Sequence, residues 1–192
     1  MILSEIQNPI IVIAGPSGSG KSTIFKFLLT QFPTLCLAVS VTTRKIRGHE
    51  IDGEQYHFIT EEEFRQRLEN NEFVEHEEVY TGKFYGTLTS EIHKITDLGK
   101  VPLLELDVKG ALSIKEIFPD RAYLIFIDPP SIESLETRLR LRGTESEENL
   151  KIRLERAEYE ISQKVHFDAV VINDDLSIAQ TEAVECVKTV IR

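Results

Sequence analysis

Four short apolar runs recur along the chain, each bounded by turn residues and none alternating with polar positions. They are Ile10–Ala14, Val101–Val108, Tyr123–Ile127 and Ala169–Ile172. Runs of this kind are typical of strands that are buried on both faces of a parallel sheet. Helical patterns separate several of them, as they do in βαβ units. The pattern therefore predicts an α/β fold with a parallel sheet flanked by helices.

Residues 39–91 interrupt this rhythm with a polar stretch rich in Thr, Glu, Gly and Tyr. One clear helix is expected there, because Thr60 and Glu63 stand at the spacing of a capping box. Phe64 and Leu68 follow as its apolar positions. We expect this stretch to be an insert that packs on the edge of the core.

Residues 131–157 depart from the rhythm a second time, with two short helical patterns that are dense in arginine and meet at Gly143. Ser131 is placed to cap the first pattern. Thr144 and Glu147 have capping-box spacing at the start of the second. We expect these helices to form a lid. The remaining segments, about 1–38, 92–130 and 158–192, are then the core of one domain spanning residues 1–192.

The composition supports one compact domain and limits its partners. A chain of 192 residues with 41% apolar residues can bury a sizeable core. A net charge of −10 and a pI near 5.1 argue against nucleic acid or an anionic membrane surface as partner. Cys36 and Cys186 lack metal-ligand spacing and are expected to be small core residues in a reducing compartment. No apolar run approaches the ~18 residues of a membrane span and no signal peptide is recognisable, so we expect a cytoplasmic protein. The sequence leaves open whether it is a monomer or a homo-oligomer.

A complete phosphate-binding motif follows the first apolar run. Residues 15–22 read G-P-S-G-S-G-K-S, which is the pattern G-x-x-x-x-G-K-[ST] between a strand and a helix. Such glycines let backbone N–H groups surround a phosphate at the positive end of the helix. Lys21 can bridge β- and γ-phosphates, and the Ser22 hydroxyl can bind Mg²⁺. A Gly/Ser turn that contains a lysine by chance is the alternative, and the flanking strand and helix disfavour it. The motif predicts a P-loop NTPase core. Its candidate ATP-binding residues are Gly15, Pro16, Ser17, Gly18, Ser19, Gly20, Lys21, Ser22 and Thr23.

The motifs after the loop resemble, in order, those of the guanylate kinase family. Residues 40–47, S-V-T-T-R-K-I-R, resemble its S-x-T-T-R-x-x-R signature. Residues 73–75 and 85–87 fall where the family places GMP-contacting residues. Residues 142–145 and 171–175 also resemble family segments. The resemblance covers nearly the whole chain. It implies transfer of the γ-phosphate of ATP to GMP, with dGMP as a further acceptor and Mg²⁺ as cofactor.

Two arginines and a tyrosine offer a site for the phosphate of GMP. Arg44 and Arg47 can each present a guanidinium fork to a dianionic phosphate, and the Tyr56 hydroxyl can add a third donor. On spacing alone, a solvated basic turn would be the simpler interpretation of the arginines. The resemblance favours the phosphate site, and it also places Tyr85 among the GMP contacts.

Glu75 is the candidate for reading the base. Guanine presents its N1–H and its 2-amino group side by side, and one carboxylate can accept from both, whereas adenine has an acceptor at N1. Taken alone, Glu75 would be one member of the charged surface run 75–78, and that interpretation is kept for Glu77 and Glu78. The resemblance places Ser40 and Thr87 on the O6 and N2 edge of the same base.

Glu105 and Asp107 lie at the end of the second apolar run. A carboxylate at this place in phosphate-loop proteins orients the metal, usually through water. The family typically has D-x-D here, so Glu105 departs by one methylene group, whereas Asp107 matches. The resemblance assigns Asp107 to GMP and, with Ser22, to the metal shell. Glu105 is a further metal candidate through a water molecule, and Lys109 has no functional interpretation.

The lid supplies several arginines. Arg138 and Arg142 are four residues apart, so on a helix they share a face and could close over the triphosphate. Arg153 lies near the apolar side of the next helix. These three match the lid and GMP-contacting arginines of the family, with surface salt bridges as the alternative. Arg140 and Arg156 do not match and are expected to face solvent.

The resemblance places adenine recognition at Asn173, with Asp174 as a weaker candidate. In this reaction the acceptor is already an anionic phosphate oxygen, so no general base is required. Catalysis is expected to come from positioning and from charge neutralisation by Lys21, Arg44 and the lid arginines. We expect both inserts to close over the substrates, which keeps water out.

Two other functions remain as alternatives. A catalytically inactive binding module of the guanylate kinase fold would bind a peptide in the GMP site, but the intact Lys21 and Ser22 argue against it. A sugar-phosphate kinase of the same fold would keep the phosphate loop. It would not require Glu75 or the pair of Arg44 and Arg47.

Overall fold

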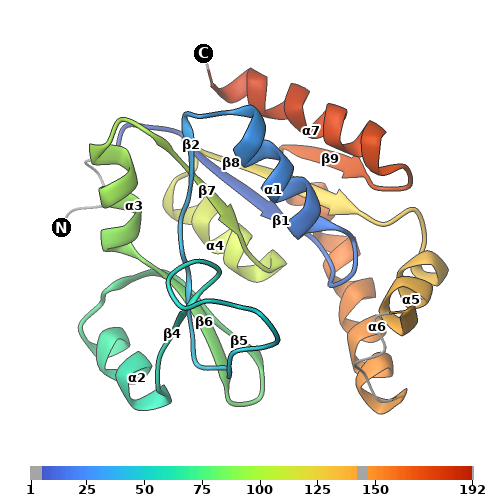
Figure 1. The fold of residues 1–192 in the computed structure, drawn as a ribbon, viewed down its shortest axis with the longest axis horizontal. Helices are drawn as coiled ribbons and strands as arrows, with labels where there is room; N and C mark the ends of the chain where they lie inside the picture. The colour runs from blue at the N-terminus through green and yellow to red at the C-terminus, as the bar shows by residue number, and fades with distance from the viewer. Residues whose placement is uncertain (1–5, 142–146, 192) are drawn as a thin grey trace.

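The computed structural model describes residues 6–141 and 147–191, and its core is one parallel sheet (Figure 1). All four strand pairings in that sheet are parallel. In spatial order its strands are β2 (Leu35–Leu37), β7 (Val101–Glu105), β1 (Ile10–Ala14), β8 (Ala122–Asp128) and β9 (Ala169–Ile172). The α/β fold with a parallel sheet flanked by helices is therefore confirmed.

The four predicted strands are all present, and two differ from prediction at their ends. β1 and β9 have the predicted bounds, and β8 is one residue longer at each end. β7 ends at Glu105, so the prediction that it reaches Val108 is wrong. The reason is that Asp107 caps the helix α4 (Val108–Ile117), its side chain accepting a hydrogen bond from the Gly110 amide.

Both faces of the sheet are covered by helices. The side chains of β1, all fully buried, alternate between two layers. Its even-numbered positions pack with α4 and with α3 (Thr89–Asp97). Its odd-numbered positions pack with α1 (Lys21–Gln31) and with α7 (Leu176–Val190). Burial on both faces explains why the apolar runs do not alternate with polar residues.

A second, smaller sheet lies within the polar stretch 39–91. Its order is β4 (His57–Phe58), β3 (Val41–Thr42), β6 (Lys83–Leu88) and β5 (Phe73–Tyr80), with β5 and β6 forming a hairpin. The predicted helix is α2 (Glu61–Glu69), and Thr60 caps it by accepting from the Glu63 amide. The other half of the capping box is replaced by an ion pair of Glu63 with Arg67. Figure 1 shows this part at the lower left, below the core sheet.

The helices α5 (Ile132–Leu141) and α6 (Glu147–Ser162) lie at the lower right of Figure 1. Ser131 caps α5 as predicted, accepting from the amide of Ser134. The two helices pack through a small cluster of their own that contains Leu135 and Leu150. α6 runs past residue 157 and ends in a 3-10 turn, Gln163–His166. Gly143 and Thr144 lie outside the described residues, and the division into core, insert and lid stays a prediction.

Candidate functional site

The phosphate-binding loop lies between the end of β1 and the start of α1, as the motif requires. Gly15 has φ +142°, and a Cβ there would lie 2.4 Å from the carbonyl oxygen of Ile127. Gly20 has φ +97°, and its Cβ would lie 2.1 Å from the side-chain amide nitrogen Nδ2 of Asn173. Both glycines are therefore favoured for two reasons, the positive φ and the close approach of Ile127 or Asn173.

Lys21 is the first residue of α1 and folds back over the loop. Its Nζ donates to the carbonyl oxygens of Gly15 and Pro16 at 2.7 and 2.9 Å. These contacts hold the ammonium group over the loop whose amides point toward a bound phosphate. An incoming phosphate can exchange with these carbonyl oxygens, so the geometry fits the predicted role of Lys21.

Ser22 and Glu105 meet at the mouth of the loop, although they are far apart in the sequence. The Ser22 hydroxyl donates to Oε1 of Glu105 at 2.6 Å. The longer glutamate thus reaches the serine directly from the end of β7. A hydroxyl and a carboxylate side by side form the kind of hard oxygen pair that Mg²⁺ prefers, with phosphates and waters completing its shell. The residues therefore fit a Mg²⁺ ion bound together with a nucleotide.

Arg44 follows strand β3 of the smaller sheet and is only 9% exposed. It forms a bidentate ion pair with Glu50, with both N–O distances 2.6 Å. Its guanidinium also stacks on the rings of Tyr56 and Phe58, at 5.0 and 5.4 Å from their centroids. A solvated basic turn would not be buried in this way. Sequence reasoning missed Glu50, whose only signal is an acidic residue shortly after two candidate phosphate ligands.

Glu50 also orders the neighbouring backbone, because its carboxylate accepts from the amide of Arg47 at 2.8 Å. These hydrogen bonds, chiefly that from Arg44, hold the pKa of Glu50 below its ordinary value. Burial raises the pKa of the nearby Tyr56 further above its ordinary value. Its ring packs edge-to-face on Tyr85. Arg47 and Tyr85 line the same cleft.

Glu75 is buried at 6% exposure, so the interpretation as a surface charge does not apply to it. It lies on β5 directly opposite Thr87 of β6, whose hydroxyl donates to its Oε1 at 2.7 Å. The hydroxyls of Thr87 and Ser40 are 3.2 Å apart, so the predicted base-reading residues form one hydrogen-bonded group. Burial raises the pKa of Glu75 to about 7, against the opposing effect of the Thr87 hydrogen bond. Glu78 is exposed, as the interpretation as a surface charge requires, whereas Glu77 is half-buried, pairs with Lys109 and lines the cleft.

Arg156 was predicted to face solvent, and this prediction is wrong. Its Nη2 donates to Oδ2 of Asp107 at 2.6 Å and its Nε to Oε1 of the buried Glu160 at 2.7 Å. Its Nη1 donates to the carbonyl oxygen of Val79 in β5. The cause is the orientation of α6, whose cleft-facing side carries both Arg156 and Glu160, four residues apart. Arg140, in contrast, is exposed and pairs with acidic neighbours, as predicted.

Two of the predicted lid arginines contact the phosphate-binding region. Arg153 donates to the hydroxyl of Ser17 in the loop at 2.9 Å. Arg138 donates to the backbone carbonyl oxygen of Asn173 at 2.8 Å. Arg142 lies outside the described residues.

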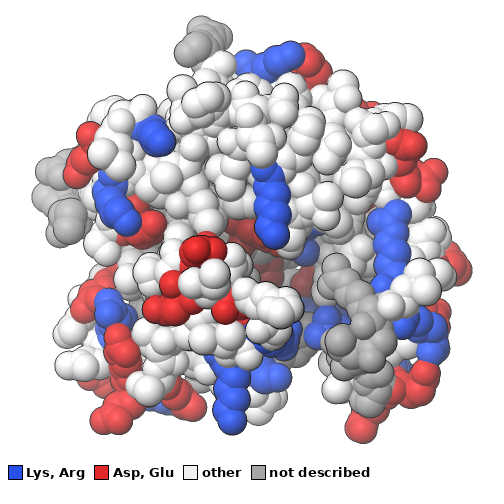
Figure 2. Space-filling view, in the orientation of Figure 1, with Lys and Arg blue, Asp and Glu red and all other residues white. Residues whose placement is uncertain are grey.

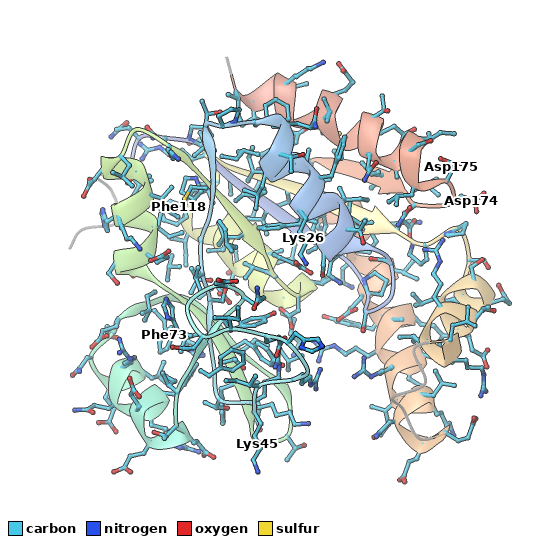
Figure 3. All side chains as sticks on the ribbon, in the orientation of Figure 1. Lys26, Lys45, Phe73, Phe118, Asp174 and Asp175 are labelled. Carbon is cyan, nitrogen blue, oxygen red and sulfur yellow. The ribbon has the colours of Figure 1, made fainter. Side chains whose placement is uncertain are left out.

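Asn173 is buried and its side-chain amide donates to the carbonyl oxygen of Ser19 at 2.7 Å. This bond fastens the end of β9 to the phosphate loop. Asp174 is exposed, and Figure 3 shows it beside Asp175 at the upper right, at the start of α7. Asp175 caps α7. The assignment of Asn173 and Asp174 to adenine stays a prediction.

One cleft of about 770 Å³ joins these groups. Figure 2 shows a hollow in the lower centre of the molecule, with acidic and basic side chains inside it. Thr87 lies buried behind Glu75, while Arg138, Asn173 and Asp174 lie away from the cleft lining. The predicted residues that line the cleft are Gly15, Ser17, Gly18, Gly20, Lys21, Ser22, Thr23, Ser40, Arg44, Arg47, Tyr56, Glu75, Tyr85, Glu105, Asp107 and Arg153.

Other candidate chemistry is sparse in the described part of the chain. Cys36 and Cys186 are free thiols, half-buried against opposite faces of the sheet, which fits their predicted role as small core residues. Within residues 6–141 and 147–191, no three His, Cys, Asp or Glu side chains gather in a way that could hold a metal ion. None of the helices described is long and apolar enough to cross a membrane.

Comparison with known proteins agrees with this geometry. The family model described as guanylate kinase matches residues 7–192. The chain belongs to the guanylate kinase family. The guanylate kinase of Bacteroides thetaiotaomicron is 45% identical over 186 residues, which cover 97% of this chain and 91% of that protein. The guanylate kinase of Porphyromonas gingivalis is 50% identical over 168 residues, covering 87% of this chain and 89% of that one.

A solved guanylate kinase shares the fold as well. The crystal structure of guanylate kinase from Anaplasma phagocytophilum superposes with a TM-score of 0.77 at 32% identity. The superposition covers 96% of this chain and 87% of that one. The predicted resemblance to the guanylate kinase family and the predicted fold class are thus confirmed.

Proposed function

We propose that this protein transfers the γ-phosphate of ATP to GMP, giving ADP and GDP, and that the two nucleotides bind at opposite sides of the one cleft. Family membership supports the reaction. The observation that carries the arrangement is the buried Glu75, a carboxylate that faces the same cleft as the phosphate loop. A phosphate loop alone would serve many reactions. Glu75 adds to the same cleft a buried carboxylate whose side-chain partner among the described residues is the Thr87 hydroxyl, and burying a charged group without a charged partner is costly.

The base site selects guanine through its polar edge. The Glu75 carboxylate accepts from N1–H and from the 2-amino group, while the Thr87 hydroxyl steadies it from behind. Ser40, whose hydroxyl proton is directed at Thr87 in the free protein, turns it to the O6 acceptor of the base. Adenine would place an acceptor against the carboxylate and leave buried lone pairs unpaired, which is strongly unfavourable.

The acceptor phosphate binds where Arg44, Arg47 and Tyr56 line the cleft. Glu50 and the two aromatic rings hold the Arg44 guanidinium in a single orientation, so little side-chain entropy is lost when the phosphate binds. The Tyr56 hydroxyl is protonated at neutral pH and donates to the same phosphate. The family resemblance implies dGMP as a further acceptor, and we expect it to be a substrate too.

The donor triphosphate binds along the phosphate loop. Lys21 exchanges its carbonyl partners for β- and γ-phosphate oxygens. Ser22 and Glu105 would hold Mg²⁺, Glu105 directly or through water. When bound, Mg²⁺ would neutralise charge on the phosphates and help to orient them. We assign Arg138 and Arg153 to charge neutralisation at the transferred phosphoryl group.

The chemical step needs positioning more than proton transfer, because the attacking oxygen is already anionic. Residues from the loop and the smaller sheet align the two phosphates, and closure of both inserts excludes water. An acidic chain of net charge −10 would repel its substrates without this concentration of cations in the cleft. We expect the protein to act in the cytoplasm and not on nucleic acid.

The test is a coupled assay for ADP release with ATP, Mg²⁺ and each of GMP, AMP, CMP and UMP. Strong turnover with GMP alone is the expected result. If folded protein that binds ATP turns over none of the four, the proposed function is wrong. The sugar-phosphate kinase and the binding module would then be the functions to examine.

A further inference from the structure

Gly110, the third residue of α4, lies directly against the carboxylate of Glu75. A Cβ on Gly110 would stand 2.9 Å from Oε2 of Glu75 and 3.6 Å from its Cδ. The first distance is shorter than real Cβ atoms show in proteins, so one of the two groups would have to move. The helix and the base-reading side chain therefore fit together only because position 110 has no side chain.

The backbone does not explain the glycine. Gly110 is helical and does not have a positive φ, unlike Gly15, Gly18 and Gly20 of the phosphate loop. Alanine is a much better helix former than glycine. A side chain at position 110 would also lie 3.2 Å from Oδ1 of Asp107. That contact is tight but milder than the one with Glu75, since the Asp107 carboxylate would have to give by only a few tenths of an ångström.

The group that would have to give way is the one proposed to read guanine. Glu75 is buried, and its other oxygen already accepts from Thr87 at 2.7 Å. A Cβ at position 110 would press on Oε2 from the α4 side, so the carboxylate could relax only by rotating or by retreating from its place in the cleft. Either movement changes the angle at which it meets N1–H and the 2-amino group, and hydrogen bonds weaken steeply with misalignment.

We propose that Gly110 is a positioning residue for guanine recognition. The space left by its missing side chain allows the Glu75 carboxylate to take the orientation in which it meets the base. This inference rests on the proposed function, since it assumes that Glu75 binds the base. It assigns the specificity of the site to two residues on different elements, β5 and α4, which are 35 positions apart in the sequence (110 minus 75).

The test is Gly110→Ala, with KM for GMP, KM for ATP, kcat and thermal unfolding measured together. Misaligning one hydrogen bond to a charged group should raise KM for GMP about 10- to 100-fold. KM for ATP should be unchanged. The melting temperature should stay close to that of the wild type, so that the rise in KM for GMP cannot be attributed to unfolding. Ser113→Ala is the matched control, because Ser113 lies on the same helix and its hydroxyl donates to the carbonyl oxygen of Lys109, within α4 itself. This control should match the wild type in every measurement.

A second variant asks whether the effect passes through Glu75. Glu75→Asp shortens the acid and withdraws it from the new methyl group, so the effect of Gly110→Ala on KM for GMP should be smaller in that background. If Gly110→Ala alone fails to fold, recovery of folding in the Glu75→Asp background supports the same clash. Failure in both backgrounds would show that the helix itself needs the glycine, and would overturn the inference.

The remaining outcomes separate this inference from the proposed function. A wild-type protein without GMP turnover would overturn the proposed function. An active wild type together with a Gly110→Ala variant of unchanged KM for GMP would overturn only the inference. Equal rises in KM for GMP and for ATP would also overturn it, because they would indicate a general disturbance of the cleft.

Discussion

Replacing Glu75 by Gln converts one oxygen of a buried carboxylate into an amide nitrogen and leaves the side-chain size almost unchanged. The Gln oxygen can keep the hydrogen bond from Thr87, which measures 2.7 Å in the wild type. The new NH₂ group then faces the donor edge of guanine, where the wild type offers an acceptor. Losing one hydrogen bond to a charged group removes about 1.5–3 kcal/mol of binding free energy. The affinity for GMP should therefore fall about 10- to 150-fold.

The same substitution should raise the free energy of unfolding, although it weakens the binding of GMP. Burial raises the pKa of Glu75 from 4.5 to about 7. The folded state thus binds this proton more tightly than the unfolded chain, so the stabilisation is complete below the unfolded pKa. It is lost as the pH rises through 7. The difference between the folded and unfolded pKa values of Glu75 lowers the free energy of unfolding by about 3 kcal/mol at pH 8. Gln carries no charge and escapes this loss.

Two assays measure these effects. Initial rates at varied GMP concentration give the loss of binding, and urea unfolding at pH 5 and pH 8 gives the two free energies of unfolding. The variant should gain up to about 3 kcal/mol over the wild type at pH 8 and much less at pH 5. A variant with wild-type KM for GMP would refute the role of Glu75. A variant less stable than wild type at pH 8 would refute the argument from its burial.

Three further substitutions test other parts of the cleft. Arg44→Lys keeps the charge but loses the fork paired with Glu50, so KM for GMP should rise about tenfold or more while KM for ATP, read from the same initial rates, stays constant. Glu105→Gln removes the charge of a proposed Mg²⁺ ligand, and a Mg²⁺ titration of the rate should show a higher half-saturating concentration. Arg156→Gln removes the cation that pairs with Asp107 and with the buried glutamate four positions after it on α6, and urea unfolding at pH 8 should show a free energy of unfolding lower by about 1–3 kcal/mol.

Controls for these variants are available on the surface of the same protein. Arg65→Lys changes an exposed arginine paired with Glu61 and should leave KM for GMP and stability almost unchanged. A rise in KM for ATP equal to that for GMP would contradict the role given to Arg44. An unaltered Mg²⁺ titration would contradict the role of Glu105. An Arg156→Gln variant as stable as the wild type would contradict the ion-pair argument.

Features that depend on residues next to one another in the chain could be predicted from the sequence. The strand β1, the phosphate loop and the start of α1 follow one another directly, and the bounds of β1 and β9 were predicted correctly. β2 was missed because a strand of three residues carries too little periodicity to be recognised. The end of β7 was misplaced because Leu106 and Val108 continue the apolar run, although Asp107 already caps the next helix.

Contacts between distant segments could not be predicted in the same way. The bond from Ser22 to Glu105 joins residues 83 positions apart, and the pairing of Arg156 with Asp107 spans 49 positions. Motif matching left Arg156 out because nothing in its own segment marks Asp107 as a partner. The acidic residue four positions after Arg156, which is buried, is the one local signal that could have corrected the prediction.

The central claim is that one cleft holds ATP and GMP with their phosphates facing each other, and a bisubstrate compound tests it most directly. Such a compound joins adenosine and guanosine through a polyphosphate chain. Calorimetry should show one molecule bound per protein chain, and kinetics should show competition with both ATP and GMP. Competition with only one nucleotide, or binding of two molecules per chain, would show that the phosphate loop and Glu75 belong to separate sites and would contradict the account.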